Sequence, residues 1–250
     1  MLVVPFVRTI VLVVALMLLW GCAPANQDRQ AAQTHYALGV SYLREPNVTE
    51  ALREFLKAVE LDPRNANLHQ VLGQTYHLKK AYPEAEKHYL EAVRLSGGDP
   101  GYYNNLGALY LDMQRWDDAV EYFRLAAGDL LFAQPEVAFT GAGTALLEKG
   151  EPLEAIEYFQ QSLEKNRRYA PAHLHMGRAY QALGRPGPAI ESFLEATRID
   201  TGYAEAYYQL GLAYMKRKED GKAREAFEKA ISLRPDSELS RKAENYLKLL

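Results

Sequence analysis

The chain has 250 residues, which is enough for one large domain or two small ones. Hydrophobic residues make up 48% and charged residues 24%, a composition typical of a folded protein and not of a disordered one. The net charge is -3 and no run of five like charges occurs, so the sequence lacks the basic face that nucleic-acid binding requires, and we exclude that class of function.

Residues 1–21 have the pattern of a secretory signal peptide. Arg8 is followed by an apolar stretch that ends at Trp20, which is short for a membrane span of roughly 20 residues. The segment Leu19-Trp20-Gly21-Cys22 resembles the lipobox of bacterial lipoproteins, in which the cysteine thiol receives a diacylglyceryl group and the peptide is cut before it. The resemblance implies that Cys22, the only cysteine, is lipidated and begins the mature chain.

Residues 22–31 are polar and without periodicity, and we interpret them as a tether that follows the lipidated cysteine. Ala23 occupies the place where Asp retains lipoproteins of enteric-type bacteria in the inner membrane, so the resemblance implies an outer-membrane protein that faces the periplasm. The alternative is an uncleaved anchor over residues 1–20, with Arg8 reaching the headgroups.

Six repeats are expected to occupy residues 32–237. A glycine recurs at intervals of 34, 34, 36, 34 and 34 residues, at Gly39, Gly73, Gly107, Gly143, Gly177 and Gly211. Twelve residues after each glycine is an alanine, four further on an aromatic residue, and three beyond that a small residue. Apolar residues one before and three after most of these glycines share one helix face, so each repeat predicts a helix pair that must stack on its neighbours.

This spacing, with Leu-Gly-x-x-Tyr and then Ala-x-x-x-Phe, resembles the tetratricopeptide repeat. The resemblance implies an all-α fold, a right-handed superhelical solenoid. We expect repeats at 32–65, 66–99, 100–135, 136–169, 170–203 and 204–237. Residues 238–250 alternate apolar and polar faces with helical spacing and predict a helix that caps the last repeat.

No constellation of residues in the sequence points to catalysis, to a metal or to a cofactor, and we expect the protein not to be an enzyme. His35, His69 and His173 share one repeat column with Tyr103, Phe139 and Tyr207, which indicates packing. We interpret His77 and His88 as solvated. The signal, tether, repeats and cap account for the whole sequence.

A concave surface lined by the first helices of the repeats is the expected protein-binding site. In tetratricopeptide proteins, residues two before the glycine, and one and four after it, often face this surface. The rule assigns these residues to a groove: Gln74, His77, Asn105, Ala108, Leu111, Thr144, Leu147 and Arg178. It also places Val71, Gly141 and His175 there. The mixed apolar and amide lining suits an extended segment or helix of a partner.

The connection between the third and fourth repeats carries the two additional residues. The sequence reads Asn104-Asn105-x-Gly107, and then Asp129-Leu130-Leu131-Phe132, ending at Pro135. Both segments resemble the type IV pilus biogenesis/stability lipoproteins, the pilotins. The resemblance implies a scaffold that brings an outer-membrane secretin to its membrane and helps it to multimerise. The alternative is a general periplasmic scaffold that tethers enzymes of envelope or polysaccharide assembly.

Overall fold

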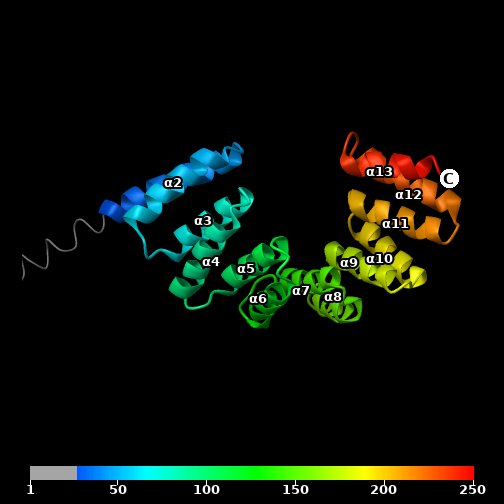
Figure 1. Cartoon of the computed structure of the whole chain (residues 1–250), viewed down its shortest axis with the longest axis horizontal. Coiled ribbons are helices and arrows are strands. Elements are labelled where there is room, and N and C mark those ends of the chain that lie inside the picture. Colours follow the sequence, from blue (N-terminus) through cyan, green and yellow to red (C-terminus); the bar gives the residue numbers. More distant parts are fainter. Residues whose placement is uncertain (1–26) are drawn as a thin grey trace, which may run out of the picture. The chain divides into compact units, whose positions relative to one another are not determined.

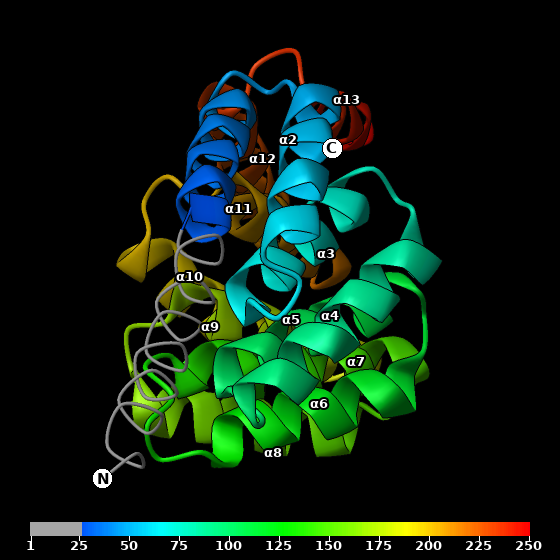
Figure 2. The same ribbon diagram turned by 90° about the vertical axis from the view of Figure 1, so that its left-hand side faces the viewer.

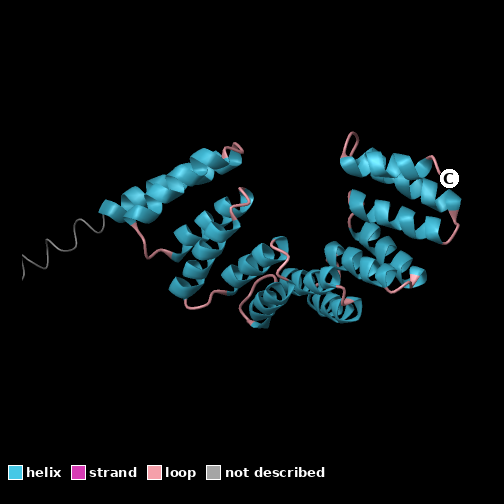
Figure 3. Ribbon diagram, in the orientation of Figure 1, coloured by secondary structure: helices cyan, strands magenta, loops and turns pink. Residues whose placement is uncertain are grey.

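The computed structural model describes residues 27–250, and within that range every regular element is a helix (Figures 1 and 3). Residues 27–44 form the first helix of the first repeat. The following helices are α2 (Val48–Leu61), α3 (Ala66–Leu78), α4 (Tyr82–Ser96), α5 (Pro100–Asp112), α6 (Trp116–Gly128), α7 (Pro135–Lys149), α8 (Pro152–Lys165), α9 (Ala170–Ala182), α10 (Pro186–Ile199), α11 (Ala204–Lys216), α12 (Asp220–Leu233) and α13 (Glu238–Leu247).

Two differences from the expected boundaries stand out. Residues 27–31, which we assigned to the tether, are helical, so the tether prediction was wrong for this part. Their polar composition suits the exposed face of a helix, which is why it suggested a tether. The fourth repeat begins at Pro135, one residue early. Residues 1–26, which include the expected signal peptide and Cys22, the residue expected to be lipidated, lie outside the described residues.

The chain forms two compact units, Met1–Tyr102 and Tyr103–Leu250. In the first, α2 packs on α3 and α3 on α4. In the second, each helix from α6 to α13 packs on the next, and α7 also contacts α9. Figure 1 shows α7 and α8 side by side as one such pair, and Figure 2 gives the same ribbon turned by 90°. Within each unit, the contacting helices therefore belong to the same repeat or to adjacent ones, as a repeat array requires.

Each helix begins and ends where the local sequence dictates. Proline stands in the first turn of α4, α7, α8, α9 and α10, where its missing N–H costs no hydrogen bond. The helices α4 and α7 end at Gly97 and Gly150, whose φ values of 75° and 94° lie in the left-handed region. These signals keep the two helices of a repeat short and antiparallel.

The recurring glycine and the recurring aromatic residue contact each other inside the repeat. A β-carbon built on Gly73 of α3 would lie 2.5 Å from Cδ1 of Tyr89 on α4, and the same relation joins Gly211 to Phe227. The alanine column is fully buried, as at Ala85 and Ala223. The glycine leaves room for the aromatic ring of the second helix, and the small alanines let the two helices approach closely. The all-α repeat fold is confirmed.

The capping helix α13 covers the last repeat as expected. Ala243 is fully buried, and the ring of Tyr246 stacks on that of Phe227 with a centroid distance of 5.6 Å and an interplanar angle of 9°. Leu239, Leu247 and Leu250 join the same apolar cluster. The Ser237 hydroxyl begins the helix by accepting the N–H of Ser240 at 3.1 Å.

Candidate protein-binding surface

In the second unit, the residues assigned to the groove lie on three first helices. Asn105, Ala108 and Leu111 are on α5, Thr144 and Leu147 on α7, and Arg178 on α9, and all six are half-buried. Arg178 donates to Oε1 of Glu148, at the end of α7, at 2.9 Å. The structure thus brings the cation of α9 beside the last turn of α7.

Two of these residues serve the helices themselves. The hydroxyl of Thr144 donates to the carbonyl of Thr140 at 2.8 Å, within its own helix. Leu147 packs against the cluster that contains Leu146 and Phe159. Neither side chain is wholly available to a partner.

In the first unit, Gln74 is exposed and His77 is half-buried. The ring of His77 lies edge-on to Tyr82 and Tyr89, with centroid distances of 5.9 and 6.4 Å. Our interpretation of His77 as solvated was therefore wrong. Contacts with two aromatic rings, both in the T-shaped geometry that aromatic pairs favour, hold this imidazole.

Three of the positions two before the glycine are packing positions between repeats, which corrects part of the groove assignment. Val71 is 7% exposed and belongs to the core cluster of Phe55. Gly141 lies against the ring of Phe123. His175 stacks on Phe159 at a centroid distance of 5.9 Å. In each case the aromatic residue of the preceding repeat packs against this position. The groove assignment used positions within a single repeat, so it did not take this contact into account.

Electrostatics set the protonation state of His175. Burial, reinforced by the nearby positive charge of Arg178, lowers the pKa of its imidazole to about 4. The neutral ring accepts a hydrogen bond from Nη1 of Arg178 at 3.3 Å. Arg178 is thereby held between His175 and Glu148, which orients its guanidinium.

The histidine column packs across the helix pair of each repeat, as its sequence pattern indicates. Tyr103 lies beside Tyr122, and Phe139 beside Tyr158. In the first unit the equivalent pairs are polar: Nδ1 of His35 is 2.6 Å from Oε2 of Glu54, and Nδ1 of His69 is 3.0 Å from Nδ1 of His88.

His88 is not solvated, contrary to our interpretation. Its ring stacks on Tyr76 at a centroid distance of 5.5 Å and on His69 at 5.2 Å. Burial first, and then the proximity of His69, lower the pKa of His88 to about 4. Residues 27–250 contain no group of three or more metal-ligating side chains, so this histidine pair stands without a third ligand of that kind.

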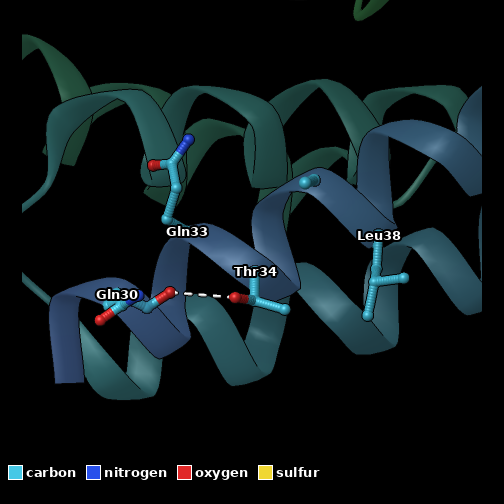
Figure 4. A pocket seen from close by; sticks show the side chains of 5 residues that line it. Gln30, Gln33, Thr34 and Leu38 are labelled. Atoms are coloured by element: carbon cyan, nitrogen blue, oxygen red, sulfur yellow. Dashed lines mark hydrogen bonds between the residues drawn. The ribbon is translucent and has the colours of Figure 1, made fainter. Parts of the chain in front are cut away.

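Two exposed apolar features were not anticipated. The first is a shallow hollow on the helix of residues 27–44, lined by Gln30, Gln33, Thr34, Ala37 and Leu38 (Figure 4). Leu38 is 45% exposed, although the repeat pattern predicts packing and the equivalent Leu72 and Leu106 are fully buried. This helix is the first described element, so no earlier repeat within residues 27–250 packs on Leu38.

The second feature is the connection between α6 and α7, where Leu130 and Leu131 are 98% and 91% exposed. The sequence revealed the additional length of this connection but not the direction of its side chains. None of the helices within residues 27–250 is both long and apolar enough to cross a membrane.

Sequence models of the tetratricopeptide repeat match residues 25–66 and 36–100, 101–127, 146–198 and 204–237, together more than half of the chain. The chain belongs to the tetratricopeptide-repeat family. Proteins of this family bind other proteins, which agrees with a surface built from stacked helices and exposed side chains, and not from a closed cavity.

The chain is also similar to proteins of type IV pilus biogenesis. It is 26% identical to the type IV pilus assembly protein PilF of Pseudomonas aeruginosa over 156 residues, which span 61% of this chain and 62% of PilF, less than two thirds of that protein.

Two solved structures share the fold over nearly their whole length. A structure of P. aeruginosa PilF matches with a TM-score of 0.71 and 21% identity, covering 88% of this chain and 99% of that one. A structure of PilW, described as a widely conserved type IV pilus biogenesis factor, matches with a TM-score of 0.76 and 20% identity, covering 86% and 99%. At these identities the likeness shows the fold alone.

Proposed function

We propose that this protein is a non-catalytic scaffold of type IV pilus biogenesis, which binds a secretin subunit and assists its outer-membrane localisation and multimerisation. The observation that carries the proposal is the sequence similarity to PilF, a protein named for type IV pilus assembly. The lengthened connection of residues 129–134 supports it, because the pilotin resemblance rests on the same segment.

The proposed role is stoichiometric. The aromatic and histidine side chains of the repeats contact one another, as in the pairs Tyr103–Tyr122 and His69–His88, so these groups stabilise the array. The groups left at the surface, such as Gln74 and Arg178, suit hydrogen bonds and ion pairs to another protein. A partner would therefore be bound and released without being chemically changed.

The test of this role is deletion of the gene, followed by electrophoresis of unboiled membrane extracts. We expect monomeric or misplaced secretin and the loss of surface pili, with both restored by the wild-type chain supplied in trans. Normal secretin multimers together with normal pili would overturn the proposal in favour of a general periplasmic scaffold for envelope assembly.

We further propose that Cys22 carries the lipid that holds the protein on the outer membrane, which would place the repeats in the periplasm beside an unassembled secretin. More than one acyl chain is needed for stable anchoring, at about 0.8 kcal/mol per buried CH2 group. Cys22→Ser should accumulate as an unprocessed precursor without palmitate label. Unchanged label and unchanged membrane fractionation would instead indicate an uncleaved anchor.

A further inference from the structure

The connection between α6 and α7, residues 129–134, presents two leucines to solvent. Leu130 and Leu131 are the most exposed large apolar residues of the described chain, at 98% and 91%. Each leaves apolar surface in water that burial against a partner would remove from solvent, which is favourable. Adjacent leucines exposed to this extent call for an explanation beyond the fold.

The backbone of this connection is held by defined hydrogen bonds. The N–H of Leu131 donates to Oδ1 of Asp129 at 2.7 Å, and the N–H of Phe132 donates to the carbonyl of Asp129 at 3.2 Å. The N–H of Asp129 in turn donates to the carbonyl of Ala126 at 3.3 Å. Phe132, which follows the two leucines, is half-buried. The leucines are thus displayed by an Asx turn.

Other connections between repeats use the same turn without apolar tips. Oδ1 of Asn166 accepts the N–H of Arg168 at 3.0 Å, and Oδ1 of Asp200 accepts the N–H of Gly202 at 2.8 Å. The two residues after the Asn or Asp are Arg167-Arg168 and Thr201-Gly202, all exposed. The turn therefore does not require leucines. The connections α8–α9 and α10–α11 have four residues each and polar or glycine tips, whereas the connection α6–α7 has six residues and carries the two leucines.

The charges along the chain on either side of the tip indicate which surface it fits. Between Arg124 and Lys149 the sequence contains no Lys, Arg or His, and the charged residues there are Asp129, Glu136 and Glu148. Apolar tips that enter membranes are usually accompanied by basic residues that attract anionic lipids. A protein pocket that is apolar inside and carries Lys or Arg at its rim complements two leucines beside Asp129.

We propose that Leu130 and Leu131 form a docking knob that inserts into an apolar pocket with a cationic rim on a protein partner. Under the proposed function, on which this inference rests, that partner is the unassembled secretin subunit. The knob is a contact point separate from the groove residues, and its preset backbone lowers the conformational entropy lost on binding.

The binding test uses the full-length protein in detergent and the purified, unassembled secretin subunit. Leu130→Ser with Leu131→Ser should weaken binding roughly tenfold to hundredfold. A matched control is Leu153→Ser with Leu249→Ser, at leucines 60% and 75% exposed outside the connection, which should bind like the wild type. Both variants should keep the wild-type melting curve, because the altered side chains are exposed. Equal affinity of the two double variants for the secretin subunit, or a lowered melting temperature of the Leu130→Ser, Leu131→Ser variant, would overturn the proposal.

A photoreactive residue in place of Leu131, in living cells, distinguishes the possible occupants. An adduct with the secretin subunit is the expected product. An adduct with lipid, with a second copy of this chain, or none at all, would refute the proposal. If deletion of the gene abolishes secretin multimers but the Leu130→Ser, Leu131→Ser strain forms them normally, the proposed function stands and the knob is refuted.

Discussion

The ring of Phe123 on α6 lies against the backbone of Gly141 on α7: a β-carbon built on Gly141 would come 2.5 Å from Cζ of Phe123. On α5, a β-carbon on Gly107 would come 2.8 Å from Cδ1 of the same ring. Phe123 is 3% exposed, so the ring fills a slot whose walls are two glycines. One side chain thereby packs its own repeat and joins it to the next.

This arrangement predicts the effect of a single methyl group. Gly141→Ala should lower the free energy of unfolding by about 1–3 kcal/mol, because the buried ring has no free space to move into. Gly187→Ala is the matched control, since nothing lies within 4 Å of a β-carbon there, and it should be neutral or stabilising by up to about 1 kcal/mol. Urea denaturation followed by circular dichroism measures both, and equal destabilisation would contradict the slot.

The capping helix predicts a second stability effect. Tyr246→Ala removes the ring that stacks on Phe227, which is fully buried in the intact protein. We expect a loss of about 1–3 kcal/mol from apolar contact and stacking. Asn245→Ala, on the exposed face of the same helix, should change stability by less than about 0.5 kcal/mol. Thermal melting compares the two variants. Coinciding melting curves would disprove the capping role of Tyr246.

Stability should fall as the pH is lowered between about 6.5 and 4. The folded-state pKa of His88 is about 4, below the ordinary value of 6.5, so the unfolded chain binds more protons in this window. The stabilisation is fully present above pH 6.5 and is lost as the pH falls toward 4. Because the ring is only half-buried, we expect an effect on the order of 1 kcal/mol.

Carboxylate protonation also destabilises at acid pH, so a variant must isolate the histidines. His69→Tyr with His88→Tyr reproduces the Tyr103–Tyr122 pair of the third repeat. Urea midpoints at pH 7.5 and 4.5 should differ less in this variant than in the wild type. A pH dependence identical in the two proteins would show that this pair makes no contribution.

The ion pair of Arg178 is expected to orient side chains more than to stabilise the fold. Arg178→Gln removes its bonds to Glu148 and His175, but the pair is more than one third exposed, so the cost should stay below about 1 kcal/mol. The pKa of His175 should rise, since a nearby cation is lost. Glu148→Gln is the control that keeps that cation. We would measure the pKa of His175 by NMR titration. Equal pKa values of His175 in the two variants would contradict this account.

The sequence was informative wherever a feature repeats with a fixed period. Gly73 and Tyr89 belong to columns that recur six times, and a recurring pair of small and aromatic residues has one simple explanation, a close helix crossing. The packing role of His69 followed from the aromatic residues that replace it in other repeats. These inferences need only local periodicity and the stacking of equal units.

What the sequence did not reveal depends on contacts outside one repeat. His175 and Gly141 look like surface positions by their register, and only the aromatic residue of the preceding repeat makes them interior. The sequence showed that the connection with Leu130 and Leu131 is lengthened, but not that these side chains point into solvent. Their exposure follows from the hydrogen bonds of Asp129. The polar pair of His69 and His88 shows the same effect, because the lowered pKa of His88 comes from its partner and burial.

The cap also determines how the chain can associate with itself. Helical repeats are mutually complementary, so an array with both end faces bare could add copies head to tail and grow into a filament, because such heterologous contacts do not close. Leu38 at the first repeat presents one such apolar face. At the other end, α13 turns Arg241, Lys242 and Glu244 outward in place of the apolar surface of α12. The charged outer face of α13 therefore disfavours head-to-tail addition of another copy at this end of the array.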